Sequence, residues 1–166
     1  MQYQITENQI ILNVKKSNLF VRGTMFLFAF LFFLFPLISI ILSISLGFGM
    51  HIGYFIILFI FGILGFYLLR IALWNTFGKE VIEISNTQIN YIADYGWFKD
   101  GKKHIDILES KSDPIVFEIR KIGYEEELKG ALTITLNEKS IFCVTKMDIP
   151  EIEEVIDHLK NHKKLQ

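Results

Sequence analysis

Residues 23 to 69 read GTMFLFAFLFFLFPLISIILSISLGFGMHIGYFIILFIFGILGFYLL, and this stretch decides the fold. It contains no Asp, Glu, Lys or Arg, and its single histidine is His51. A helix needs about 20 apolar residues to cross the hydrocarbon core of a bilayer. The stretch is long enough for two such helices and a tight turn, so we expect a transmembrane helical hairpin.

The two spans are predicted over residues 24 to 46 and 52 to 74. Leu, Ile and Phe dominate both, and each favours insertion by roughly 0.3 to 0.6 kcal/mol at a helix centre. We expect the glycine-rich turn from Gly47 to Gly53 to lie at the far interface, where water can reach its backbone. A cleaved signal peptide is disfavoured because the preceding polar segment is long and no small-residue cleavage site follows the apolar run.

The flanking charges predict the orientation of the hairpin. Lys15, Lys16 and Arg22 precede the first span, and Arg70 and Lys79 lie around the exit of the second. The turn between the spans carries no Lys or Arg. Positive charge accumulates on the cytoplasmic side of a membrane. We therefore expect an integral membrane protein with two spans and with both termini in the cytoplasm.

Composition divides the chain into three parts. Residues 1 to 22 are an N-terminal β segment, residues 23 to 75 are the hairpin, and residues 76 to 166 are a cytoplasmic domain that holds most of the charge. The chain has 17 Lys and Arg against 18 Asp and Glu, a balance that argues against a nucleic-acid partner. Cys143 is the only cysteine, so no disulfide can form within the chain. Because it alternates with Phe142 and Val144, we expect it to be core or half-buried.

Two short β-prone runs precede the hairpin, Tyr3 to Thr6 and Gln9 to Lys15, and the turn-forming pair Glu7-Asn8 divides them. They are too short to fold alone. Because a two-span hairpin returns the chain to the side it left, we expect one or both runs to join the sheet of the C-terminal domain.

The hydrophobic period changes to two from Lys79 onward, which indicates β-strands. Tyr95 to Gly101 reads as a turn or loop within this region, and Asn137 to Lys139 as a hairpin turn. The six strands are predicted over residues 80–85, 87–94, 102–109, 115–121, 131–136 and 140–145. Strands this evenly punctuated predict an antiparallel meander or small barrel.

An amphipathic helix is predicted at the C-terminal end. Asp148 can cap it, Pro150 suits its first turn, and acidic residues lead while lysines trail. Its apolar stripe consists of Ile149, Ile152, Val155, Ile156 and Leu159. We expect this helix to close the open end or face of the barrel.

The run EVIEISNTQINYIADYGWF from Glu80 to Phe98, followed by KKHIDI from Lys102 to Ile107, resembles bacterial pleckstrin-homology-like (PH-like) domains behind two-helix membrane hairpins. The resemblance covers roughly residues 79 to 162. It implies an α+β fold, a PH-like antiparallel β-barrel or sandwich of about six or seven strands with a C-terminal helix, and a place at the bacterial inner membrane. The basic residues with which eukaryotic relatives bind phosphoinositides are missing at Ser85-Asn86-Thr87, so the resemblance implies no inositol-lipid site.

No catalytic motif is present: the chain has no nucleophile elbow, phosphate loop, zinc-protease helix or paired cysteines. Glu154, His158 and His162 have metal-ligand spacing on a helix, but a solvated polar face explains them better because no further ligand cluster is evident. We therefore expect neither an enzyme nor a cofactor. A membrane-bound hydrolase or metal enzyme that uses His158 and His162 is the disfavoured alternative.

One surface segment interleaves aromatic and basic groups, a composition that suits lipid headgroups or a protein partner. A β-turn with a solvated tip is the ordinary alternative. The candidate binding residues are Trp97, Phe98, Lys99, Lys102, Lys103 and His104. A second feature, Glu125-Glu126-Glu127, could dock a basic partner, although a charge run is usually a solvated loop.

Taken together, these features predict a membrane-anchored binding or regulatory module. Its partner is expected to be another membrane protein, and one version is an immunity or inhibitor protein that neutralises a membrane-acting toxin. The alternative is an anionic-lipid-binding module that uses the segment Trp97 to His104. Small residues on the spans, Ser39 and Ser43 on the first and Gly62 and Gly65 on the second, allow close helix contact within the hairpin or between protomers of a homo-oligomer.

Overall fold

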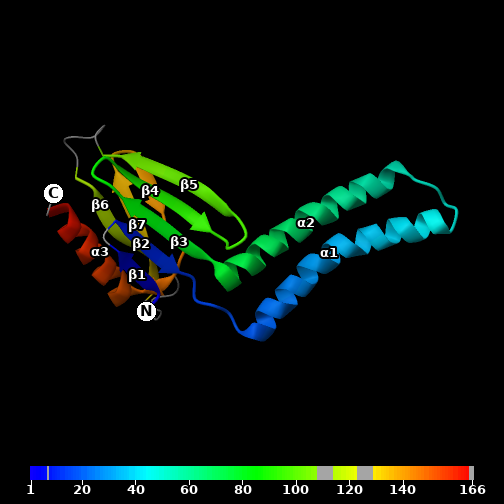
Figure 1. Cartoon of the computed structure of the whole chain (residues 1–166), viewed down its shortest axis with the longest axis horizontal. Coiled ribbons are helices and arrows are strands. Elements are labelled where there is room, and N and C mark those ends of the chain that lie inside the picture. Colours follow the sequence, from blue (N-terminus) through cyan, green and yellow to red (C-terminus); the bar gives the residue numbers. More distant parts are fainter. Residues whose placement is uncertain (7, 108–113, 123–128, 165–166) are drawn as a thin grey trace. The chain divides into compact units, whose positions relative to one another are not determined.

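The computed structural model describes residues 1–6, 8–107, 114–122 and 129–164, without the side chains of residues 162–164. It divides the chain into two compact units, Met1–Lys15 with Phe77–Gln166, and Lys16–Thr76. The first unit is a β-rich domain and the second is a helical hairpin (Figure 1). The architecture is α+β, and the β-domain is assembled from chain segments on both sides of the hairpin.

The hairpin consists of α1 (Leu19–Ser45) and α2 (Ile52–Phe77), which lie side by side (Figure 1). Both helices are long and apolar enough to cross a membrane. α1 begins at Leu19 rather than at residue 24, because Arg22 limits the apolar span without breaking the helical backbone. In the connection, Gly47 and Gly49 have φ values of 81° and 74°, which glycine adopts without strain.

Small residues bring α1 and α2 together. A Cβ added at Gly65 would lie 3.0 Å from the ring of Phe33, so the absence of a side chain there lets the helices approach. The hydroxyls of Ser43 and Tyr54 form a hydrogen bond between the helices. A Cβ added at Gly62 would meet no atom within 4 Å. Of the two glycines, Gly65 is therefore the one that the helix contact requires.

An antiparallel five-stranded sheet has the order β1-β2-β3-β4-β5. β2 and β3 pair from Gln9 opposite Glu83 to Asn13 opposite Lys79, so the N-terminal strands join the sheet as the sequence predicts. The strands are β1 (Tyr3–Thr6), β2 (Gln9–Asn13), β3 (Lys79–Ile84), β4 (Gln88–Asp94) and β5 (Lys99–Asp106). β5 begins at Lys99 rather than at residue 102, which shortens the predicted loop after β4 to a tight turn.

A second sheet has the order β6-β7-β8, with β9 also paired to β7. Its strands are β6 (Val116–Lys121), β7 (Lys129–Leu136), β8 (Lys139–Phe142) and β9 (Met147–Asp148). Asn137 has a φ of 54° in the turn between β7 and β8, at the predicted hairpin. The predicted strand over residues 140–145 ends at Phe142, and the chain pairs with β7 again at Met147 opposite Gly130.

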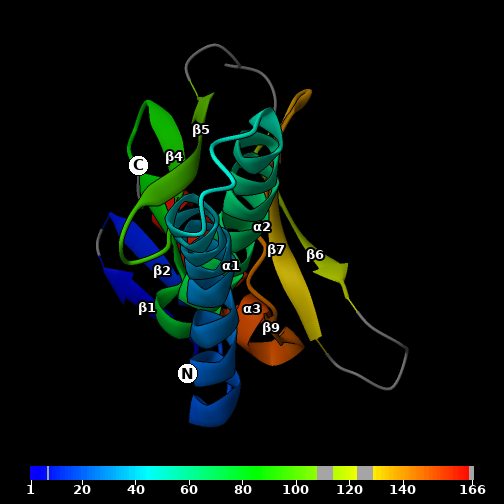
Figure 2. The same cartoon turned by 90° about the vertical axis from the view of Figure 1, so that its right-hand side faces the viewer.

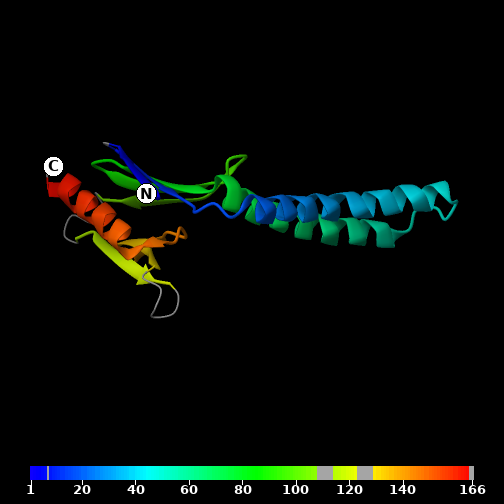
Figure 3. The same ribbon diagram turned by 90° about the horizontal axis from the view of Figure 1, so that it is seen from below.

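The C-terminal helix α3 (Ile149–Lys164) packs on β6, β7 and β9 and touches β1. Figures 2 and 3 show the two sheets as separate layers, with α3 against the four-stranded one. Its predicted apolar stripe faces the core, with Ile152, Val155, Ile156 and Leu159 buried. The core also contains apolar side chains from both sheets, among them Ile10, Leu12, Ile82, Ile89, Leu132, Ile134 and Ile141.

The sheets do not close into a barrel. In the described ranges, no strand of the β1–β5 sheet pairs with a strand of the β6–β9 sheet. The structure therefore agrees with the coarse prediction of antiparallel sheets and a C-terminal helix, whereas a closed barrel is not formed and the PH-like assignment stays a prediction.

Candidate functional site

The two connections to the hairpin and the turn between β4 and β5 lie at one end of the five-stranded sheet. Its last cross-strand row consists of Asn13, Lys79, Asp94 and Lys99, which lie opposite one another on β2, β3, β4 and β5. Beyond this row the chain leaves β2 toward α1, arrives at β3 from α2, and turns from β4 into β5. We call this row the anchored end, because both connections to the hairpin start there.

The two connections at the anchored end are joined to each other. Gly78 is the one residue between α2 and β3, and its carbonyl oxygen accepts a hydrogen bond of 3.1 Å from the N–H of Val14. Phe77, the last residue of α2, packs against Gly96, where an added Cβ would lie 2.8 Å from the Cβ of Phe77. The turn between β4 and β5 is thus in direct contact with the end of α2.

The turn Tyr95–Phe98 is held by its own contacts. The N–H of Tyr95 donates to the carbonyl oxygen of Phe98 at 2.9 Å, and the N–H of Gly96 donates to Asp94 Oδ1 at 2.8 Å. Gly96 has a φ of 86°, which other residues adopt only with strain. The rings of Tyr95 and Phe98 stack with centroids 4.7 Å apart. Trp97 is left at the tip with 64% of its surface exposed.

The structure does not gather the six predicted binding residues into one cluster. Phe98 is half-buried against Tyr95, while Trp97 and Lys99 are exposed at the anchored end. Lys102, Lys103 and His104 are exposed farther along β5. A strand advances about 3.3 Å per residue, so Lys103 lies roughly 13 Å from Lys99. Trp97 and Lys99 therefore lie on one surface and Lys103 on another.

The second surface is centred on Phe142 of β8. Lys103 Nζ lies 5.8 Å from the centre of its ring and Arg120 Cζ lies 5.6 Å from it, both within cation–π range. Arg120 also donates from Nη2 to the carbonyl oxygen of Cys143 at 3.2 Å. We call Lys103, Arg120 and Phe142 the Phe142 cluster. Phe142 is 46% exposed.

His104, the last of the six, takes part in neither surface. Its Nε2 lies 3.9 Å from Asp106 Oδ2, two residues farther along β5. Side chains alternate between the faces of a strand, so His104 and Asp106 share the face opposite Lys103. The two aromatic and basic surfaces therefore do not include the histidine.

A buried glutamate that sequence reasoning missed connects the two sheets. Glu80 of β3 is fully buried. Its Oε1 accepts hydrogen bonds from the hydroxyl of Tyr91 at 2.5 Å and from the N–H of Val144 at 2.7 Å, and its Oε2 accepts one from the N–H of Thr145 at 2.9 Å. Val144 and Thr145 lie between β8 and β9, where the ladder to β7 is interrupted. Glu80 thus satisfies backbone donors that the ladder leaves free.

The sequence does contain a signal for this role. Glu80 lies on the same face of β3 as the buried Ile82. An acidic side chain at a buried position needs hydrogen-bond partners. Burial and the neighbouring Glu80 carboxylate raise the pKa of Tyr91 above its ordinary value of 10.0, so its hydroxyl stays protonated as the donor. Burial also raises the pKa of the Cys143 thiol, which is buried as the sequence predicts, and this opposes reactivity as a thiolate.

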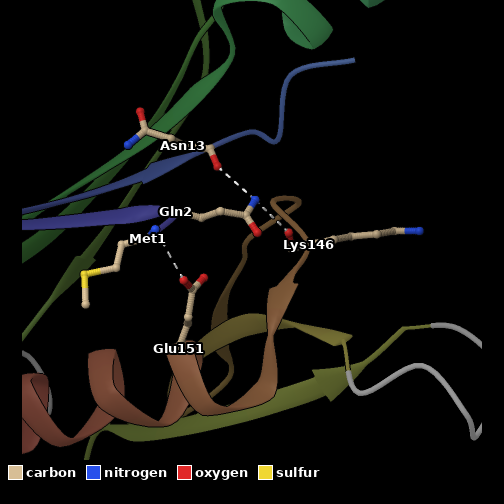
Figure 4. A network of polar contacts seen from close by, with 5 residues as sticks. All are labelled: Met1, Gln2, Asn13, Lys146 and Glu151. Carbon is tan, nitrogen blue, oxygen red and sulfur yellow. Dashed lines mark hydrogen bonds and ion pairs between the residues drawn. The ribbon is translucent and has the colours of Figure 1, made fainter. Parts of the chain in front are cut away.

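Polar contacts also tie the N-terminal segment to the C-terminal part of the domain (Figure 4). Gln2 Nε2 donates to the carbonyl oxygens of Asn13 and Lys146, each at 3.3 Å. The amino group of Met1 lies 3.8 Å from Glu151 Oε1. These contacts reach from the two residues before β1 to Lys146 and to the helix α3, so the segment before the hairpin is an integral part of the domain.

Neither the metal alternative nor the acidic run gains support. In the part of the chain that the structure describes, no group of three or more His, Cys, Asp or Glu could hold a metal ion. His158 is exposed on α3, and the side chain of His162 lies outside the described residues. Glu125, Glu126 and Glu127 lie outside them as well.

Comparison with known proteins gives no match: no family model, no curated protein and no solved structure is significantly similar to the chain. The functional assignment therefore depends on the geometry of the anchored end and of the Phe142 cluster.

Proposed function

We propose that this protein is a membrane-anchored binding or regulatory module. Its hairpin spans the inner membrane of a bacterium twice, and its β-domain lies at the cytoplasmic face. The length and apolar composition of α1 and α2 support insertion. Lys15, Lys16 and Arg22 before the first span, with no Lys or Arg in the turn, support the cytoplasmic location of both termini.

The observation that carries this proposal is the pairing of Asn13 with Lys79. The chain leaves the domain and returns to it on neighbouring strands, so both connections join the domain at the same end. Gly78 alone joins α2 to β3, and residues 14–18 join β2 to α1. A residue spans at most about 3.6 Å, so even the longer connection reaches only about 18 Å. Such short connections hold the domain next to the bilayer surface.

The proposed partner is another membrane protein, and an immunity or inhibitor protein against a membrane-acting toxin is one specific form of this proposal. The Phe142 cluster supports a protein partner. Its exposed aromatic ring lies beside Val144, which is 58% exposed, and Lys103 and Arg120 flank it. Aromatic residues and arginine are enriched where protein interfaces bind most strongly.

Membrane insertion is tested by alkaline carbonate extraction of membranes from cells that express the full chain. An inserted hairpin stays in the membrane pellet, whereas release of the chain into the supernatant would contradict the anchor. The partner is tested in the same membranes with a photoreactive phenylalanine analogue at position 142. We expect a crosslink to one membrane protein from this position and none from the analogue at the exposed position of Lys160 on α3. No crosslink from position 142, or equal crosslinking from both positions, would contradict a partner site at Phe142.

A further inference from the structure

Trp97 is an exposed aromatic side chain at the tip of a turn that the structure holds in one conformation. The turn is fixed by one backbone hydrogen bond, one hydrogen bond to the Asp94 carboxylate, the stacked pair Tyr95 and Phe98, and the contact of Gly96 with Phe77. A large indole on a fixed support loses little conformational entropy when it enters a contact. Tryptophan is also the residue type that accumulates at membrane interfaces, since its ring is apolar and its N–H is polar.

The position of this turn follows from chain connectivity. Phe77 ends α2, Gly78 follows, and Lys79 already belongs to the last row of the sheet. The turn lies next to that row because Asp94 and Lys99 are its flanking residues. Trp97 therefore lies at the same end of the domain as Phe77, the last residue of α2.

The charge at the anchored end is predominantly positive. Lys15 and Lys99 are exposed there. Lys79 Nζ lies 3.6 Å from Asp94 Oδ2, so these two charges offset each other. Asp100 is the remaining acidic residue next to the turn, and one of its carboxylate oxygens accepts a hydrogen bond from the N–H of Gly101. The exposed lysines thus outnumber the acidic groups that could repel an anionic surface.

We propose that the turn Tyr95–Phe98, together with Lys15 and Lys99, is a contact site for the anionic headgroups of the leaflet that the hairpin enters. The indole of Trp97 lies among the headgroups, and the ammonium groups of the two lysines lie close to lipid phosphates. This site rests on the proposed function, because it requires the hairpin to be inserted. It narrows the predicted lipid-binding segment to Trp97 and Lys99, and it excludes Lys103, which contacts Phe142 instead.

The site gives the domain a third support on the membrane. The two chain connections hold the domain only at the β2 and β3 end of this row. A contact at the β4–β5 turn, farther along the same row, opposes tilting of that part of the row away from the bilayer.

The test uses the full chain reconstituted into vesicles of phosphatidylcholine, with or without phosphatidylglycerol. The variant Trp74→Phe leaves Trp97 as the only tryptophan, and lipids spin-labelled near the headgroup quench its fluorescence if it is close. We expect quenching and a blue-shifted emission that are stronger in the anionic vesicles. Replacing Lys15 and Lys99 by Gln in this background should reduce the anionic excess of quenching by at least half. The matched control Lys103→Gln, which removes one charge from the same strand, should leave it unchanged.

A second variant separates failure of this site from failure of the anchor. Trp97→Phe leaves Trp74 near the end of α2, and lipids labelled in the upper part of the acyl chains report whether that helix is inserted. Quenched Trp74 with unquenched Trp97 would overturn the lipid site and leave the anchor intact. Quenching of Trp97 that is equal in neutral and anionic vesicles, or that falls as much with Lys103→Gln as with Lys99→Gln, would also overturn the assignment to anionic headgroups. Unquenched Trp74 would refute the proposed function itself.

Discussion

The hydroxyl of Tyr91 on β4 donates a hydrogen bond of 2.5 Å to the buried carboxylate of Glu80 on β3. The same carboxylate accepts hydrogen bonds from the backbone N–H groups of Val144 and Thr145, which lie between β8 and β9. One acidic side chain therefore links the five-stranded sheet to the interruption between β8 and β9. The link is made by a side chain, because the backbone of β3 already pairs with β2 and β4.

Glu80→Ala should destabilise the domain strongly, because it leaves two backbone N–H groups and one hydroxyl without their acceptor. Each unsatisfied buried donor costs about 1 to 3 kcal/mol, so we expect a loss of about 3 kcal/mol or more. Glu83→Ala is the matched control on the same strand, since Glu83 is exposed and its loss should change stability by less than about 0.5 kcal/mol. Denaturant unfolding in detergent, followed by circular dichroism, measures both. Similar losses of stability for the two variants would contradict the role of Glu80 as a link to the backbone of Val144 and Thr145.

Stability should fall in alkaline solution. The raised pKa of Tyr91 means that the unfolded chain releases its proton near the ordinary value of 10.0 while the folded chain still holds it. Above that pH the native state binds more protons than the unfolded state, so stability decreases as pH rises. Cys143 acts in the same direction from its ordinary value of 9.0, and a hydrogen bond to Glu154 raises the pKa of Tyr3 to about 12.

This stabilisation is present in full below about pH 9 and decreases progressively as the pH rises above that value. Tyr91→Phe should remove part of the slope, because the phenyl ring has no proton to release. It should also lower stability at neutral pH by about 1.5 to 3 kcal/mol through loss of a hydrogen bond to a charged group. Unfolding midpoints measured from pH 7 to pH 11 provide the comparison. An unchanged alkaline slope in the variant would assign the effect to other groups.

Gly96→Ala should cost more than Gly101→Ala. Both glycines have positive φ, 86° and 67°, so both alanines carry a backbone penalty of roughly 1 to 2 kcal/mol. The new Cβ at Gly96 would in addition lie 2.8 Å from Phe77, whereas nothing lies within 4 Å at Gly101. The difference between the two unfolding free energies therefore isolates the contact of the turn with the end of α2. Equal costs would mean that this contact is not tight.

Gly65→Leu and Gly62→Leu test the packing of the hairpin. The larger side chain at Gly65 collides with Phe33, and overpacking of this kind typically costs about 1 to 3 kcal/mol. Gly62 has open space around it, so its variant should leave the hairpin intact. Thermal unfolding of the helical signal in detergent micelles distinguishes them. A larger effect at Gly62 would indicate a contact with another protomer at that position.

The hairpin and α3 could be predicted from sequence because composition alone specifies them. A run without charge from Gly23 to Leu69 favours two long apolar helices, and the stripe of Ile152, Val155, Ile156 and Leu159 favours one buried helix face. The boundaries were less accurate, since α1 continues through Arg22 to Leu19 and β5 begins at Lys99. A helix or strand can continue through charged residues, whereas a hydrophobicity pattern places the end of the element at them.

The candidate site was predicted less well, because neighbours in sequence are not neighbours in space on a strand. Trp97 and Lys99 stay at the anchored end, while Lys103 lies roughly 13 Å along β5 and meets Phe142. No local pattern connects Lys103 to a residue 39 positions later, nor Glu80 to Val144, which is 64 positions away. Such contacts depend on how the two sheets come together, and the closed barrel that the sequence suggested gives a different arrangement.

The most direct test of the central claim is the accessibility of single cysteines to a membrane-impermeant maleimide in intact cells. The native Cys143 is buried and serves as a silent background, which the unmodified chain checks. His51→Cys lies in the turn of the hairpin, and Glu153→Cys lies on the exposed face of α3. The account predicts that His51→Cys is labelled from outside and that Glu153→Cys is labelled only after the cells are permeabilised. Labelling of Glu153→Cys in intact cells would contradict a cytoplasmic domain held by a two-span anchor.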